Sequence, residues 1–203
     1  MTQEGYHSRL RAWDGLRELL AKSALRAGPA RPADVRYAGY HFDCTRVTLT
    51  PDGADLVADA FLEKIEALGE CPDAIGGATP GADTILGPVM MRAFERGRWY
   101  TTFYVRSEPK SHGTQFWIDN PPAAGSKVVI VADVVTDGHS TLSAVGQATL
   151  GGCEVAAVIA LIDCEQDGAQ VIRARCAQYI PLFRLCDFPE VETVRARGEH
   201  ACR

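Results

Sequence analysis

Two unbroken apolar segments constrain the fold of this chain more than any other feature of its sequence. They cover Val128–Val131 and Val155–Ile162 and are rich in valine and isoleucine. Short continuous segments of this kind are typical of parallel strands that are buried on both faces of a sheet. Helical patterns at 54–68, 82–96 and 141–150 alternate with strand patterns, so the sequence predicts an α/β fold with a central, mostly parallel sheet flanked by helices.

Weaker patterns predict the remaining elements. We expect strands near 73–77, at 99–105 and at 180–183, and a loop over 106–122 with room for a hairpin. An amphipathic helix is expected from Leu10 to a stop signal at Ala27–Pro29, followed by a short strand or hairpin at 35–43. The 203 residues fit a single domain, 1–203, with a small N-terminal part of helix and hairpin at 1–45.

Composition excludes several classes of function. Hydrophobic residues make up 46% of the chain and charged residues 23%, as in globular proteins, and the net charge of −5 argues against a nucleic-acid or polybasic membrane binder. No apolar segment approaches the roughly 18 residues that span a bilayer, and the N-terminus does not resemble a signal peptide, so we expect a cytoplasmic protein. The seven cysteines have irregular spacing, which predicts neither a disulfide framework nor a protein metal site.

One carboxylate stands where the first apolar segment is expected to end. Asp133 is followed by the loop Thr136–Thr141, which is rich in hydroxyl groups and leads into a helix. Backbone N–H groups at a helix N-terminus bind phosphate, and Gly138 permits a close approach of the backbone. Asp133 can accept hydrogen bonds from sugar hydroxyls, so the pattern favours a sugar-phosphate site. The alternative is an ordinary connecting loop in which Thr141 caps the helix; the Walker pattern is absent.

Four segments in order resemble the orotate phosphoribosyltransferase family of type I phosphoribosyltransferases. The Asp133–Thr141 segment is similar to the motif that binds phosphoribosyl diphosphate (PRPP), and Arg106–Thr114 is similar to the family's mobile catalytic loop. The other two segments are Phe42–Pro51, which is similar to the region after the base-binding hairpin, and Ile162–Gly168, which is similar to a conserved turn. The matches together span roughly residues 35–170.

The resemblance implies a fold, a reaction and a set of site residues. The fold is that of the type I family, with residues 1–45 as a hood on the base side. The reaction transfers 5-phosphoribose from PRPP to orotate or a related planar acceptor and releases pyrophosphate, with Mg²⁺ bound through PRPP. The family also implies a homodimer in which each catalytic loop reaches into the neighbouring site. The implied catalytic residues are Arg106, Lys110, His112 and Asp133; the implied PRPP residues are Thr79, Asp133, Thr136, Asp137, Gly138, His139, Ser140 and Thr141; the implied base-binding residues are Arg36, Phe42 and Cys164.

The chain departs from the family pattern at several of these positions. Ala132 replaces the first of two adjacent acids, Ser107 replaces a loop lysine, and Cys164 replaces an arginine that holds the polar edge of the base. Pro80 stands where many members have lysine, and His139 where they have a small residue. Two other functions therefore stay open: a non-catalytic protein that binds PRPP or nucleotide, and a transferase that acts on a purine-type base.

Overall fold

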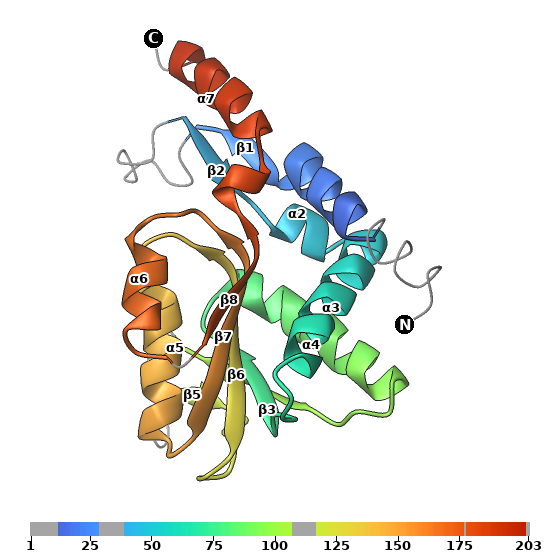
Figure 1. Ribbon diagram of the computed structural model, residues 1–203, viewed down its shortest axis with the longest axis vertical. Helices are drawn as coiled ribbons and strands as arrows, with labels where there is room; N and C mark the ends of the chain where they lie inside the picture. The colour runs from blue at the N-terminus through green and yellow to red at the C-terminus, as the bar shows by residue number, and fades with distance from the viewer. Residues whose placement is uncertain (1–11, 29–38, 107–116, 177, 202–203) are drawn as a thin grey trace.

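A twisted six-stranded sheet forms the centre of the protein. The computed structural model describes residues 12–28, 39–106, 117–176 and 178–201 (Figure 1). The strands lie in the order β5-β4-β3-β6-β7-β8, and every pair is parallel except β4 and β5. Their bounds are β3 (Ala74–Gly77), β4 (Thr101–Val105), β5 (Ile118–Asp119), β6 (Lys127–Val135), β7 (Glu154–Asp163) and β8 (Tyr179–Arg184). The predicted fold class is confirmed.

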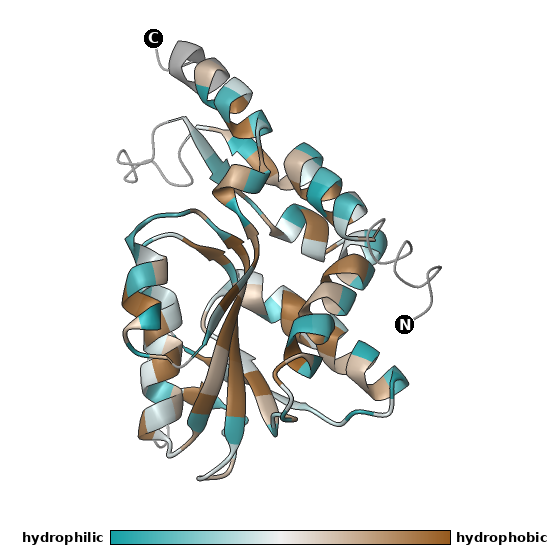
Figure 2. Cartoon of the chain, viewed as in Figure 1, coloured by the Kyte–Doolittle hydropathy of each residue, from teal (hydrophilic) through white to brown (hydrophobic). Residues whose placement is uncertain are grey.

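Helices cover both faces of this sheet, which explains the unbroken apolar segments. The helices α3 (Pro51–Glu66) and α4 (Pro80–Glu95) lie on one face, and α5 (His139–Leu150) and α6 (Asp167–Arg173) lie on the other. Val129 and Val131 of β6 pack in the core on the α3–α4 side, whereas Val128 and Ile130 pack on the α5 side. Successive side chains of a strand point to opposite faces, so both sets must be apolar. Figure 2 shows the resulting hydrophobic centre and the hydrophilic outer faces of the helices.

The N-terminal part departs from its prediction at one point. A helix over 12–19 continues as a π-helical turn (η1, Leu20–Ala24), and the chain then forms β1 (Leu25–Ala27) instead of the expected end of the helix. This strand pairs antiparallel with β2 (Tyr40–Phe42), with Leu25 opposite Phe42, and that pairing overrides the local helical pattern. The strand predicted at 35–43 is confirmed at 40–42, while 35–38 lie outside the described residues. A short helix, α2 (Thr45–Thr48), follows.

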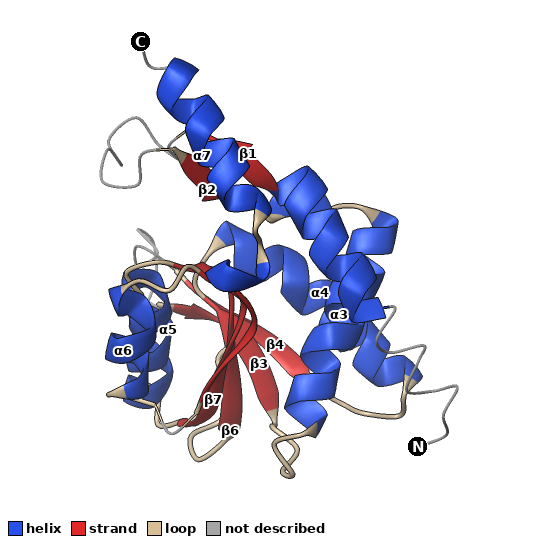
Figure 3. Cartoon of the chain, turned by 45° about the horizontal axis from the view of Figure 1, so that its top comes forward, coloured by secondary structure: helices blue, strands red, loops and turns tan. Residues whose placement is uncertain are grey.

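The C-terminal segment packs against the N-terminal hairpin. A 3₁₀ turn (η3, Leu185–Asp187) follows β8, and α7 (Glu190–Ala201) packs against both β1 and β2 (Figure 3). Phe188 and Val191 are buried at this junction. The sequence patterns did not predict α6 or α7, because their apolar residues are few and widely spaced. The β1–β2 hairpin and the C-terminal helix α7 thus bring both ends of the chain together.

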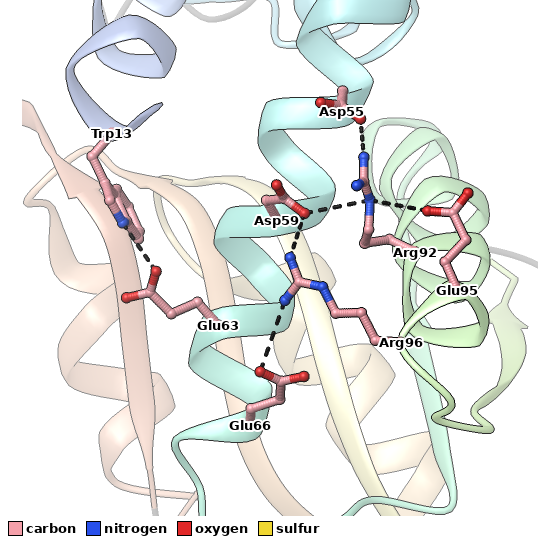
Figure 4. A network of polar contacts seen from close by, with 8 residues as sticks. All are labelled: Trp13, Asp55, Asp59, Glu63, Glu66, Arg92, Glu95 and Arg96. Carbon is pink, nitrogen blue, oxygen red and sulfur yellow. Dashed lines mark hydrogen bonds and ion pairs between the residues drawn. The ribbon is translucent and has the colours of Figure 1, made fainter. Parts of the chain in front are cut away.

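A network of ion pairs joins the exposed sides of α3 and α4 (Figure 4). Arg96 contacts Asp59 at 2.7 Å and Glu66 at 3.8 Å, and Arg92 pairs with Asp55 and with Asp59. These side chains are partly exposed, and exposed pairs of this kind each contribute about 0–1 kcal/mol. The network supports the packing of α3 against α4. Within the described ranges, no helix has both the length and the apolar character to cross a membrane.

Candidate functional site

A cavity of about 510 Å³ opens at the carboxyl ends of β6 and β7. Ligands of open parallel sheets collect at this edge. Four parts of the chain form its walls: β2, the loop before α4, the end of β6 with the start of α5, and the turn after β7. The cavity brings together these residues that the sequence singled out: Phe42, Thr79, Asp133, Thr136, Asp137, His139, Ser140 and Cys164.

Asp133 lies inside strand β6 and not after it. The strand was expected to end at Val131, but it continues to Val135 and stays paired with β7 as far as Asp163. The hydroxyl of Thr79 donates a hydrogen bond of 3.1 Å to Oδ1 of Asp133. Burial raises the pKa of the Asp133 carboxyl, and hydrogen bonds from the Val134 backbone and from Thr79 oppose this rise. The carboxylate is therefore held in one orientation at the cavity wall.

The N-terminus of α4 approaches Asp133 so closely that only glycine fits. A Cβ atom on Gly81 would lie 1.8 Å from Oδ2 of Asp133 and 2.2 Å from its Cγ. Thr79 caps the same helix, since its hydroxyl accepts a hydrogen bond of 3.0 Å from the Ala82 backbone. One threonine thus fixes both the helix start and the carboxylate.

The loop after β6 presents a helix N-terminus to the cavity. Gly138 has a φ of 77°, a left-handed conformation that favours glycine, and serves as the N-cap of α5. The helix begins at His139, so Thr141, which is buried, is not its cap. The backbone N–H of His139 donates to Asp137 at 3.1 Å. An anion that binds this N–H would compete for it with Asp137.

Aromatic rings and a thiol line another part of the cavity. The ring of Phe42 lies 5.0 Å from that of Phe188 and 6.2 Å from that of Tyr40, which also lines the cavity. Cys164 is buried, and desolvation together with the nearby Asp163 carboxylate raises its pKa to about 12. The thiol is therefore neutral at physiological pH.

Gln166 and His41 also line the cavity, although they were absent from the predicted site, and Tyr40 lines it beside Phe42. The side-chain oxygen of Gln166 is buried and has no hydrogen-bond partner among the described residues. An unpaired buried acceptor of this kind has a ligand N–H as a natural partner. Gln166 belongs to the turn that resembled the family, which was the only signal for it in the sequence.

Of the cations predicted for the catalytic loop, Arg106 lies among the described residues. Arg106 forms an ion pair of 2.5 Å with Asp119 of β5 and does not line the cavity. Lys110, His112 and Arg36 lie outside the described residues. Ala132, at the position of the missing acid, is buried in the apolar cluster on the α5 side of the sheet.

Known proteins with similar sequences are orotate phosphoribosyltransferases. The chain is 37% identical to that of Rhodopirellula baltica over 174 residues, which cover 84% of this chain and 90% of the relative. It is 36% identical to that of Thermosynechococcus vestitus over 177 residues, which cover 86% and 89%. No family model matches the sequence. Because the relatives are named as transferases, they favour turnover over the non-catalytic alternative.

Solved structures give the same result. The orotate phosphoribosyltransferase of Mycobacterium tuberculosis in complex with PRPP has a TM-score of 0.72 and 26% identity, and the match covers 87% of this chain and 98% of that one. The same enzyme with Fe(III) dicitrate has a TM-score of 0.76 and 29% identity, with coverage of 88% and 99%. Fold, cavity position and sequence agree: the chain belongs to the orotate phosphoribosyltransferase family and is a phosphoribosyltransferase.

Proposed function

We propose that the protein transfers 5-phosphoribose from PRPP to orotate, giving orotidine 5′-phosphate and pyrophosphate. The observation that carries this proposal is the convergence of Asp133, Thr79 and the loop 136–140 on one cavity that is also lined by the aromatic residues Tyr40 and Phe42. The loop and the N-terminus of α5 suit the 5′-phosphate. The oriented Asp133 carboxylate suits a ribose hydroxyl, and Phe42 with Tyr40 suits a planar base. The product nucleotide joins a phosphate, a ribose and a base in one molecule, so the lining residues suit all three of its parts.

Catalysis in this site depends on positioning and on stabilising the leaving group. Negative charge grows on the departing pyrophosphate while the sugar becomes cationic, so cations near the pyrophosphate lower the barrier. We assign this role to Arg106, Lys110 and His112 of the catalytic loop. A loop that closes over the site also excludes water from the reactive sugar.

Mg²⁺ fits the site as a partner of PRPP and not as a resident of a protein cage. The described residues hold no group of three or more acidic, histidine or cysteine side chains placed to bind a metal. Asp133, Asp137 and nearby hydroxyls are the oxygen donors on offer, and Mg²⁺ prefers few carboxylates together with substrate oxygens and water. When bound with PRPP, the ion would neutralise part of the pyrophosphate charge.

The active unit proposed here is a homodimer that shares its sites. Arg106 pairs with Asp119 of β5 and does not line the cavity of its own chain, and the resemblance to the family implies that the loop after it reaches into the neighbouring site. Mixing the inactive variants Lys110→Ala and Asp133→Asn tests this arrangement. If the loop acts in the partner's site, random mixed dimers regain one intact site and roughly a quarter of the activity. If each loop serves its own subunit, the mixture stays inactive.

The remaining assignments complete the proposal. Arg36 and Cys164 join Phe42 on the base side, and residues 1–45 form the hood within a single domain. The reaction belongs to pyrimidine biosynthesis in the cytoplasm. The departures from the family are compatible with this role, since the buried Ala132 leaves Asp133 as the carboxylate for the ribose.

The proposed reaction has a direct optical test. Orotate loses its characteristic ultraviolet absorbance when N1 is glycosylated, so we expect a decrease that requires both PRPP and Mg²⁺. The Asp133→Asn variant is the matched control, because it keeps the shape of the side chain and removes its charge. A wild-type protein that leaves orotate unchanged at saturating PRPP would refute the proposal.

A further inference from the structure

The described residues that line the cavity provide no lysine or arginine to bind the carboxylate of an acceptor on the base side. Orotate carries such a carboxylate. Cys164 has a neutral thiol, and the carboxylates of Asp163, Asp133 and Glu165 lie near enough to affect its titration. A bound carboxylate would therefore meet negative potential from these described groups, and a described cation close to this wall would offset it.

The structure places such a cation on α7. The guanidinium carbon of Arg195 lies 5.4 Å from the ring centre of Tyr40, a cation–π geometry. Tyr40 is buried and lines the cavity, so Arg195 acts through a wall one aromatic ring thick. Burial and the neighbouring Cys164 raise the pKa of the Tyr40 phenol, and the charge of Arg195 opposes that rise. Cavity, ring and guanidinium are thus in electrostatic contact.

The backbone is built to hold Arg195 in this place. Gly39 has a φ of 114°, and a Cβ atom there would lie 2.7 Å from Cγ and 3.3 Å from Cα of Arg195. The glycine therefore lets α7 lie directly on the hairpin (Figure 3). Phe188 and Val191 anchor the start of α7 in the core. The exposed Glu192 contacts Arg195 at 3.6 Å, and such an exposed pair is screened by water.

We infer that Arg195 is a positioning residue that determines acceptor specificity: from behind Tyr40 it supplies positive charge to the base side and favours acceptors with a carboxylate over their neutral counterparts. The inference rests on the proposed function and adds a residue outside the resembling segments. It also gives α7 a role in the reaction, since the helix carries the charge to the hairpin.

Orotidine 5′-phosphate and uridine 5′-phosphate form a matched pair of probes, since they differ only in the carboxylate. Calorimetric titration of both nucleotides into wild type and Arg195→Met separates charge from general packing. A unit charge acting across a ring in partly wet surroundings changes affinity by roughly three- to tenfold. We expect the affinity of Arg195→Met for orotidine 5′-phosphate to fall by this factor and that for uridine 5′-phosphate to stay unchanged.

Two further variants keep the test specific. Arg195→Lys retains the charge and is expected to restore most of the preference for the carboxylate. Glu192→Gln removes a negative charge from the same helix, so the preference for the nucleotide with the carboxylate is expected to stay the same or to increase.

Three results would overturn the inference. If Arg195→Met loses affinity equally for both nucleotides, the role of Arg195 is purely structural. If both affinities stay unchanged, Arg195 has no role in acceptor binding. If wild type binds neither nucleotide, the proposed function is itself refuted and the inference falls with it.

Discussion

The contact between Gly81 and Asp133 makes the sharpest prediction about the PRPP site. The new Cβ atom of Gly81→Ala would lie only 1.8 Å from Oδ2 of Asp133, 2.2 Å from its Cγ and 2.9 Å from its Cβ. Atoms at such distances cannot coexist, so one group must move. The carboxylate is the end of a side chain, whereas the alanine is fixed to the first turn of α4. We therefore expect Asp133 to rotate away from the position it holds with Thr79.

The expected loss follows from the bond that the carboxylate is proposed to make. A charge-assisted hydrogen bond contributes about 1.5–3 kcal/mol, and about 1.4 kcal/mol changes an affinity tenfold. PRPP should therefore bind roughly ten- to a hundredfold more weakly to Gly81→Ala. Isothermal titration with PRPP and Mg²⁺ measures this loss directly.

The same helix supplies a matched control. Gly87 also lies in α4, but a Cβ atom there would meet nothing within 4 Å. Alanine in an open helical position stabilises a protein by about 0.5–1 kcal/mol. Gly87→Ala should melt at a higher temperature and bind PRPP normally. Normal PRPP binding by Gly81→Ala, or an equal loss in Gly87→Ala, would refute the reasoning.

Three other perturbations have clear expected outcomes. Burial raises the pKa of Asp133, so the folded state holds this proton more tightly than the unfolded state, and stability falls as pH rises through that window. Asp133→Asn should therefore raise the free energy of unfolding at pH 7 and raise it less at a pH of about 4, and it should weaken PRPP binding. Urea unfolding at both pH values measures the stability gain, and a gain that grew on acidification would contradict the reasoning. Thr79→Val removes the cap of α4 and the donor to Asp133, which should cost about 1 kcal/mol of stability and weaken PRPP binding, whereas Thr79→Ser should keep both; identical melting of all three proteins would exclude the cap. Arg96→Met should lower the free energy of unfolding by less than about 1 kcal/mol, and the difference should vanish in concentrated salt; a larger, salt-independent loss would show that the network does more than pair surface charges.

The fold was predictable where sequence periodicity and burial agree. The segments at Val128–Val131 and Val155–Ile162 lie in the neighbouring interior strands β6 and β7, whose side chains are buried on both faces, so continuous apolar sequence was an unambiguous sign. The strand β1 was not predictable, because Leu25–Ala27 continue the helical pattern and become extended only through pairing with Tyr40–Phe42. Tertiary pairing of this kind leaves no local signal.

The loops that line the candidate site could be picked out from the sequence, but the contacts between them could not. Asp133 and Thr136–Ser140 are adjacent in sequence and carry their chemistry in a recognisable pattern. The contact of Gly81 with Asp133 joins α4 to β6, and the contact of Arg195 with Tyr40 joins the two ends of the chain. Such contacts depend on how elements pack, so a sequence pattern cannot show them.

Phosphorus NMR of the protein with PRPP, Mg²⁺ and an acceptor tests the central claim most directly. With orotate, the account predicts loss of the PRPP signals and the appearance of pyrophosphate and a nucleotide monophosphate; parallel samples with uracil and with hypoxanthine should leave PRPP intact. Intact PRPP in the orotate sample, or turnover with hypoxanthine alone, would contradict the assignment of this chain as an orotate-specific transferase.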